Sequence, residues 1–182
     1  MRRGRYLGPS AVLMSVLVTG GHSHAQRIDT RPPHLRNAGI DQRLNEQLPL
    51  DLGFRDESGN AVELRQYFGR KPVVLTFAYY ECPMLCTMVL NGLVKAMRAI
   101  SMDVGKDFEV INISINPREA PSLAASTKNT YVQEYGRPGA GSGWHFLTGD
   151  ESAIRRAAAA AGYRYGFDPV TGQFTHASGI MV

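Results

Sequence analysis

The chain has 182 residues, of which 43% are hydrophobic and 20% are charged. This length and apolar content suffice for one globular domain and leave no room for a second of ordinary size. The formal net charge is +4, but three of the 20 basic residues and none of the 16 acidic ones lie within residues 1–25, so the remainder carries +1. So small a charge argues against nucleic acid as a partner.

The first 25 residues have the order of an export signal. Arginines near the start precede an apolar run at 11–18, and small residues before Gln26 suit cleavage after Ala25. The run is shorter than the roughly 20 residues of a membrane-spanning helix, so we expect a cleaved signal peptide, with an uncleaved membrane anchor as the alternative. Export predicts a location in the periplasm or cell envelope, where two nearby thiols pair unless a metal or a reductant keeps them apart.

Residues 26–46 are polar and contain Pro32-Pro33, so we expect a flexible tether before a folded domain at 47–182. Alternating apolar residues predict an N-terminal β-hairpin, and the apolar run at 73–78 is typical of a central strand buried on both faces. The expected strands are 48–54, 62–64, 73–78, 108–115, 144–147 and 163–167, and the expected helices are 83–102, 120–135 and 151–161.

The alternation of strands and helices predicts an α/β fold, with a central mixed β-sheet and helices on both faces. Residues 180–182 have the composition of a buried strand, and the chain stops there without a cap or a turn. We therefore expect a C-terminal strand and helix to be missing from the domain.

The only two cysteines occur in the motif Cys82-Pro83-Met84-Leu85-Cys86. Cys82 follows the central strand and Cys86 lies about one helical turn further on, so the two sulfurs can converge at a helix N-terminus, whose partial positive charge favours thiolates. This arrangement suits a redox-active pair or a soft-metal chelate. A structural disulfide is the alternative in an oxidising compartment, but a link across so short a loop stabilises little.

A soft metal held by two sulfurs needs a third ligand, and His176 is the best candidate because it follows a turn and precedes an apolar strand. A surface or hydrogen-bonded role is the alternative for this histidine. Two thiolates and one imidazole suit Cu(I), and one added oxygen ligand suits Cu(II), whereas structural zinc prefers four protein ligands. Met84 and Met88 are soft auxiliary candidates, although helical methionines more often fill a core. The other histidines are set aside by position: His22, His24, His34 and His145.

Five segments carry a family resemblance: 74–77, 80–86, 114–121, 144–149 and 175–178. They resemble the Sco/SenC/PrrC family, and the likeness runs from about residue 46 to the end. The resemblance implies a thioredoxin-like fold, copper held by Cys82, Cys86 and His176, and a role in delivering copper to the binuclear copper centre of a respiratory cytochrome oxidase. Asn116 departs from the family, which commonly has aspartate there, and this changes the charge expected near the site.

The same residues support competing functions. A metallochaperone would take copper from a donor and pass it to the copper-accepting subunit of the oxidase by ligand exchange, with the redox state of the cysteine pair controlling binding. A thiol–disulfide oxidoreductase would instead reduce cysteines of an oxidase subunit or another exported protein, using a periplasmic thiol reductant. The lack of a proline beside His176 argues against a general thioredoxin-type enzyme. A redox or copper sensor would use the same three residues.

Overall fold

The computed structural model describes residues 37–82 and 85–182, except for the side chains of residues 85 and 86. The expected signal peptide and most of the expected tether therefore lie outside the described residues. Within these ranges, no helix has the length and apolar character needed to cross a membrane.

The central sheet runs in the order β4-β5-β6, and its strands are parallel. Their bounds are Val73–Ala78 for β4, Glu109–Ser114 for β5 and Trp144–Leu147 for β6. Met181 adds an antiparallel bridge beside β4, in which its backbone exchanges hydrogen bonds of 2.8 and 2.9 Å with Leu75. The sheet is therefore mixed, as the sequence predicts, and the apolar run at 73–78 forms a central strand.

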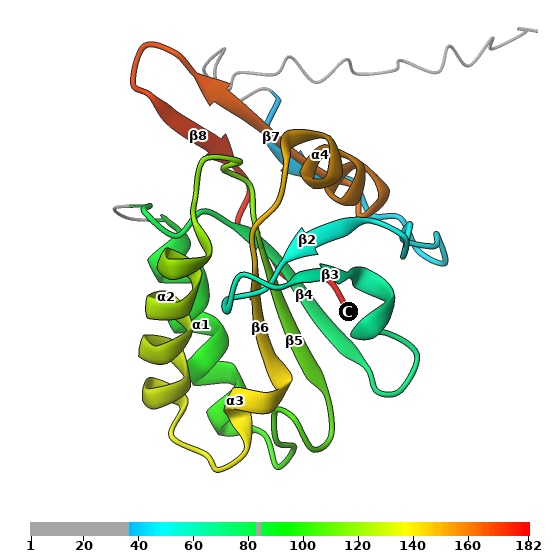
Figure 1. The fold of residues 1–182 in the computed structure, drawn as a ribbon, viewed down its shortest axis with the longest axis vertical. Helices are drawn as coiled ribbons and strands as arrows, with labels where there is room; N and C mark the ends of the chain where they lie inside the picture. Colours follow the sequence, from blue (N-terminus) through cyan, green and yellow to red (C-terminus); the bar gives the residue numbers. More distant parts are fainter. Residues whose placement is uncertain (1–36, 83–84) are drawn as a thin grey trace, which may run out of the picture. The chain divides into compact units, whose positions relative to one another are not determined.

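Helices cover both faces of this sheet (Figure 1). The bounds are α1 Leu85–Ala99, α2 Pro121–Tyr135, α3 Ala140–Gly143 and α4 Glu151–Ala160, with a 3-10 turn η2 at Leu64–Gln66. Neighbouring residues of β5 point to opposite faces, so Val110 packs with Leu93 of α1 in one core and Ile111 packs with Ile154 of α4 in the other. This confirms the predicted α/β layering.

The predicted N-terminal hairpin is present but short. It pairs β2 (Gly53–Arg55) with β3 (Ala61–Glu63) in antiparallel register. The first strand was expected to begin at residue 48, but the carbonyl groups of Leu50 and Leu52 accept hydrogen bonds from Arg65 (2.9 Å) and Leu64 (3.1 Å) at η2 instead. Leu48, Leu50 and Leu52 therefore pack on the core without joining the strand ladder, which begins at Gly53.

A second antiparallel group of strands carries the C-terminal part of the described chain. It has the order β1-β7-β8, with bounds Gly39–Ile40, Tyr163–Asp168 and Gln173–His176. The Asp41 N–H donates to the Gly162 carbonyl (2.8 Å), and a Cβ at Gly162, whose φ is +69°, would lie only 1.9 Å from the Asp41 carbonyl oxygen. Residues 39–41 are thus folded onto the domain, and the expectation of an unstructured tether is wrong for this part.

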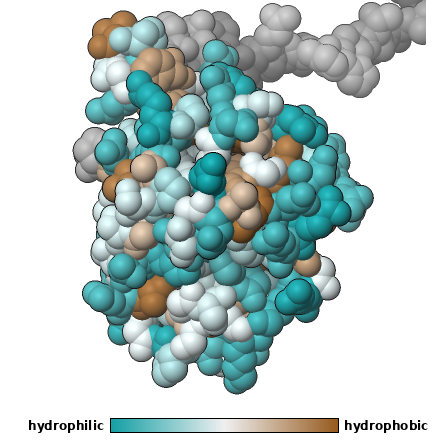
Figure 2. Space-filling model, viewed as in Figure 1, coloured by the Kyte–Doolittle hydropathy of each residue, from teal (hydrophilic) through white to brown (hydrophobic). Residues whose placement is uncertain are grey.

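Hydrophilic side chains predominate on the face shown in Figure 2, with apolar ones scattered among them. Large apolar side chains that are exposed include Met88 of α1, which is 67% exposed, and Phe167 and Val170 of the β7–β8 hairpin. The interpretation of Met88 as core filling is therefore wrong.

Candidate metal site

The candidate site lies at the carboxyl edge of the central sheet. The carboxyl ends of β4 and β5 meet there, because the two strands are parallel and Ala78 is in register with Ser114. The chain leaves β4 through Tyr79, Tyr80 and Glu81 and reaches Cys82 within four residues. This edge is where open α/β sheets place their ligand sites.

Two neighbouring tyrosines hold the segment that leads to the first cysteine. The Tyr80 hydroxyl lies 2.9 Å from the Leu147 carbonyl and 3.0 Å from the Asn112 carbonyl, and burial keeps the pKa of Tyr80 well above its usual value. The carbonyl of Tyr79 accepts a hydrogen bond from the Cys82 N–H (3.3 Å). Cys82 itself is only 9% exposed. The backbone at the first predicted ligand is thus fixed by the sheet.

Cys86 lies in the first turn of α1, as the sequence predicts. Its side chain, together with Pro83 and Met84, lies outside the described part of the structure. Among the side chains that are described, no three from histidine, cysteine, aspartate and glutamate form a group suited to a metal ion. The pairing of the two sulfurs therefore remains a prediction from their spacing.

His176 ends β8 and is 8% exposed, so a surface role is excluded. Its Nδ1 lies 2.9 Å from the carbonyl oxygen of Ala177 and 3.1 Å from the hydroxyl of Tyr163. A carbonyl oxygen can only accept, so this contact places the proton on Nδ1 and the lone pair on Nε2. Anchoring one ring nitrogen in this way sets the tautomer and orientation of metal-binding histidines.

Tyr163 connects His176 to the end of β4. Its ring stacks on Phe77 with 4.9 Å between centroids, and its hydroxyl lies 3.2 Å from the Phe77 carbonyl. Tyr79 approaches the His176 ring edge-on, with 5.9 Å between centroids. The structure thus brings His176 to the segment that carries Cys82, although 94 positions separate the two residues in the sequence.

Glu119 is a residue of this region that the sequence did not single out. It precedes α2, is 8% exposed, and accepts hydrogen bonds from the Glu81 N–H (2.9 Å) and the Ser114 hydroxyl (2.5 Å). Burial raises the pKa of Glu119, and these hydrogen bonds oppose that effect. In the sequence, an acid just before a helix is ordinarily explained by the helix dipole. Only the fold shows that it reaches the loop before Cys82.

Asn116 has a local role. Its side-chain oxygen accepts a hydrogen bond from the Arg118 N–H (3.1 Å), and its backbone N–H donates to the Ser114 hydroxyl (3.0 Å). The side chain therefore shapes the turn between β5 and α2. The buried carboxylate of this turn belongs to Glu119, three residues further on.

His145, which the sequence analysis set aside as a ligand, packs within the domain. Its Nε2 lies 3.2 Å from a carboxylate oxygen of Glu109, and its ring packs against Tyr67 with 4.4 Å between centroids. Burial lowers the pKa of His145, which favours the neutral imidazole. These contacts lie at the amino end of β5, whereas the ring of His176 lies beside Tyr79, after the carboxyl end of β4.

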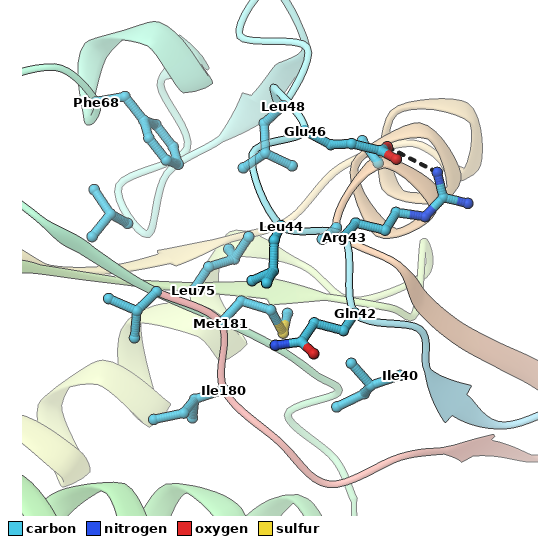
Figure 3. Close-up of a pocket in the computed structure, with 14 residues that line it drawn as sticks. Ile40, Gln42, Arg43, Leu44, Glu46, Leu48, Phe68, Leu75, Ile180 and Met181 are labelled. Carbon is cyan, nitrogen blue, oxygen red and sulfur yellow. Dashed lines mark hydrogen bonds and ion pairs between the residues drawn. The ribbon is translucent and has the colours of Figure 1, made fainter.

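A cavity of about 420 Å³ lies elsewhere in the domain (Figure 3). Ile40, Leu44, Leu48, Phe68 and Met181 line it beside Leu75, near the middle of β4. An ion pair of 2.9 Å between Arg43 and Glu46 lies at its margin. None of the described residues that line it is a cysteine or a histidine, and we therefore treat the candidate metal site, at the end of the same strand, as a separate feature.

The fold and the site define a thioredoxin-like domain with a cysteine at the carboxyl edge of its sheet and a buried histidine beside it. The chain belongs to the SCO1/SenC family, whose match covers residues 41–182. No curated protein sequence matches the chain.

Several solved structures share the fold. A proposed electron transfer protein from Aquifex aeolicus is 22% identical with a TM-score of 0.61, and the match covers 76% of each chain. ScoI from Bradyrhizobium japonicum, solved with copper bound, is 26% identical with a TM-score of 0.51, covering 68% of this chain and 73% of that one. Apo Sco1 from Thermus thermophilus is 25% identical with a TM-score of 0.52, covering 74% of this chain and 73% of that one.

Proposed function

We propose that this protein is a copper metallochaperone that binds copper through Cys82, Cys86 and His176. The observation that carries the proposal is the position of His176, which is buried beside the end of β4 with its Nδ1 anchored on the Ala177 carbonyl. That anchor leaves the lone pair on Nε2, and the ring of His176 lies beside Tyr79, in the segment that leads to Cys82. The copper bound to the related ScoI of Bradyrhizobium japonicum supports copper as the metal.

The proposed ligand set suits the transfer of copper as well as its binding. Thiolate sulfur and imidazole nitrogen are soft ligands that favour Cu(I), and three protein ligands leave room for a ligand from an acceptor to enter. Copper then moves by ligand exchange, as each new bond to the acceptor replaces a bond to the chaperone. The acceptor that we propose is the copper-accepting subunit of a respiratory cytochrome oxidase.

The redox state of the cysteine pair controls binding in this proposal. A disulfide between Cys82 and Cys86 would remove both thiolates, and two equivalents of a periplasmic thiol would restore them while becoming a disulfide themselves. The low exposure of Cys82, at 9%, disfavours its direct attack on a protein disulfide and so favours the chaperone over the oxidoreductase. We further propose export to the periplasm or cell envelope, directed by residues 1–25.

The test mixes the copper-loaded protein, under anaerobic conditions, with a purified, copper-free soluble domain of the oxidase subunit. We expect the acceptor to gain copper when its own cysteines are already reduced. Cys82→Ser and Cys86→Ser variants should fail to deliver. If the protein keeps its copper but reduces the cysteines of an oxidised acceptor, the oxidoreductase is the correct function and the chaperone proposal is wrong.

A further inference from the structure

Glu119 is the only acidic residue that is buried in the described part of the chain. A carboxylate in such a position is costly unless its oxygens are satisfied, and no lysine or arginine is among its described partners. Its carboxylate also forms none of the described contacts to the first turn of α2, whose N-cap is Ala120. Neither an ion pair nor a helix cap therefore explains its burial.

What Glu119 does is join two loops at the carboxyl edge of the sheet. One carboxylate oxygen accepts from the Ser114 hydroxyl (2.5 Å) at the end of β5. The other accepts from the N–H of Glu81 (2.9 Å), 38 positions earlier in the chain. Glu81 is itself exposed and directly precedes Cys82. The carboxylate thus fixes the peptide unit that leads to the first predicted copper ligand.

We propose that Glu119 is a positioning residue of the copper site, which acts by holding the Glu81 peptide and thereby the place of the Cys82 sulfur. This inference rests on the proposed function, because it assigns the copper site a supporting residue. Partners that orient ligands in this way commonly change metal affinity by 10- to 100-fold when they are removed.

Two substitutions separate the hydrogen bonds from the charge. Glu119→Ala removes both bonds, and we expect the affinity for Cu(I) to fall about 10-fold. Glu119→Gln can keep both: its oxygen accepts from Glu81, its NH₂ donates to Ser114, and the Ser114 hydroxyl donates to the Asn116 carbonyl, which lies 3.2 Å away. We therefore expect Glu119→Gln to remain within about threefold of the wild type.

The matched control is Glu109→Ala at the opposite end of β5. Glu109 is also a poorly exposed glutamate: its side chain is 16% exposed, and it contacts Lys71 and His145. It lies five residues before Ser114, about 16 Å along the strand. We expect Glu109→Ala to lower stability without changing copper affinity.

The measurement is competition for Cu(I) against a chelator, made anaerobically on reduced proteins. The proposal is overturned if Glu119→Ala binds copper as the wild type does, if Glu109→Ala loses as much affinity, or if Glu119→Gln falls as far as Glu119→Ala. Should Glu119→Ala fail to fold, Glu119→Asp replaces it: this variant keeps the charge but is one carbon too short to hold both partners. Its affinity should fall about 10-fold, and wild-type affinity would overturn the proposal.

A second readout keeps this inference apart from the proposed function. The equilibrium of the Cys82–Cys86 pair with a glutathione buffer is measured on the metal-free proteins, and we expect Glu119→Ala to change its constant several-fold. If the wild type binds no copper, the proposed function fails. A shift in this equilibrium with Glu119→Ala and not with Glu109→Ala would still support positioning of the cysteine loop, and its absence would overturn it.

Discussion

The two ends of β5 each have a poorly exposed glutamate, but the two carboxylates have different surroundings. At the amino end, Glu109 contacts the ammonium group of Lys71 (2.9 Å) and the ring of His145 (3.2 Å). Beyond the carboxyl end, Glu119 contacts only a hydroxyl and backbone groups among its described partners. The first carboxylate is balanced by charge, whereas the second holds a loop in place.

This difference suggests that residues at one end of β5 stabilise the fold and that residues beyond its other end support the metal site. Lys71 also donates to the Gly105 carbonyl, so its ammonium group connects the loop at Gly105 to the amino end of β5. The carboxyl edge has Cys82, His176 and Glu119. Well-packed apolar side chains in their place would stabilise the fold at least as well, so stability alone does not explain these three residues. We infer that residues at the amino edge maintain the fold and that those at the carboxyl edge serve the metal.

The largest effect expected from this comparison comes from the two histidines. His176→Ala removes a proposed ligand, and we expect the affinity for Cu(I) to fall about 100-fold, equivalent to about 2.7 kcal/mol. His145→Ala, at the amino edge, should leave the affinity unchanged. Anaerobic titration against a competing chelator measures both. Equal losses in the two variants would remove the distinction between the edges.

Tyr163→Phe should have a smaller effect on the same property. It removes the hydroxyl that lies 3.1 Å from His176 Nδ1 and 3.2 Å from the Phe77 carbonyl, so the imidazole loses part of its support. We expect copper affinity to fall about 10-fold. Tyr135→Phe is the control, because its buried hydroxyl contacts the Val104 N–H (3.4 Å) in the other core. An unchanged affinity in Tyr163→Phe would show that the hydroxyl does not orient His176.

Glu109→Gln should lower the stability of the fold and leave the copper affinity unchanged. It weakens the contacts to Lys71 and His145, and we expect the free energy of unfolding to fall by about 1 kcal/mol. Urea denaturation measures this change, and copper affinity should stay at the wild-type value. A copper site that weakened in this variant would mean that the two ends of β5 are energetically coupled.

The smallest effect is a dependence of stability on pH through His145. Burial lowers its pKa in the folded protein, whereas in the unfolded chain it has its ordinary value. The unfolded chain therefore takes up a proton first as the pH falls, and stability decreases from the ordinary histidine pKa down through the folded one. We expect His145→Gln to flatten this decrease by less than about 1 kcal/mol between pH 7.5 and 5.5. Urea midpoints across that range test it, and identical slopes would contradict the assignment.

Much of the fold follows from local patterns in the sequence. The apolar run at 73–78 forms β4, and Asp150, directly before the helix expected at 151–161, caps α4 by accepting a hydrogen bond from the Ala153 N–H (2.8 Å). The pairing of β1 with β7 did not follow, because a two-residue strand has no periodicity and its partner is more than 120 positions away. Such contacts depend on the tertiary fold, which brings Gly162 against Asp41.

The residues of the candidate site likewise fall into those that the sequence reveals and those that only the fold reveals. Cys82 and His176 stand out because cysteine and histidine have distinctive chemistry and recognisable neighbours in the sequence. Tyr163 and Glu119 do not, because a tyrosine in a strand and a glutamate before a helix are ordinary residues. Their roles come from contacts with His176 and Glu81 that only the folded chain creates.

The most direct test of the copper site is X-ray absorption at the copper edge of the reduced protein loaded with one equivalent of Cu(I). The account predicts two sulfur neighbours and one nitrogen neighbour, with the nitrogen lost in His176→Ala. A first shell of sulfur alone in the wild type, or a nitrogen that persists in His176→Ala, would show that the buried histidine at the end of β8 does not bind the metal.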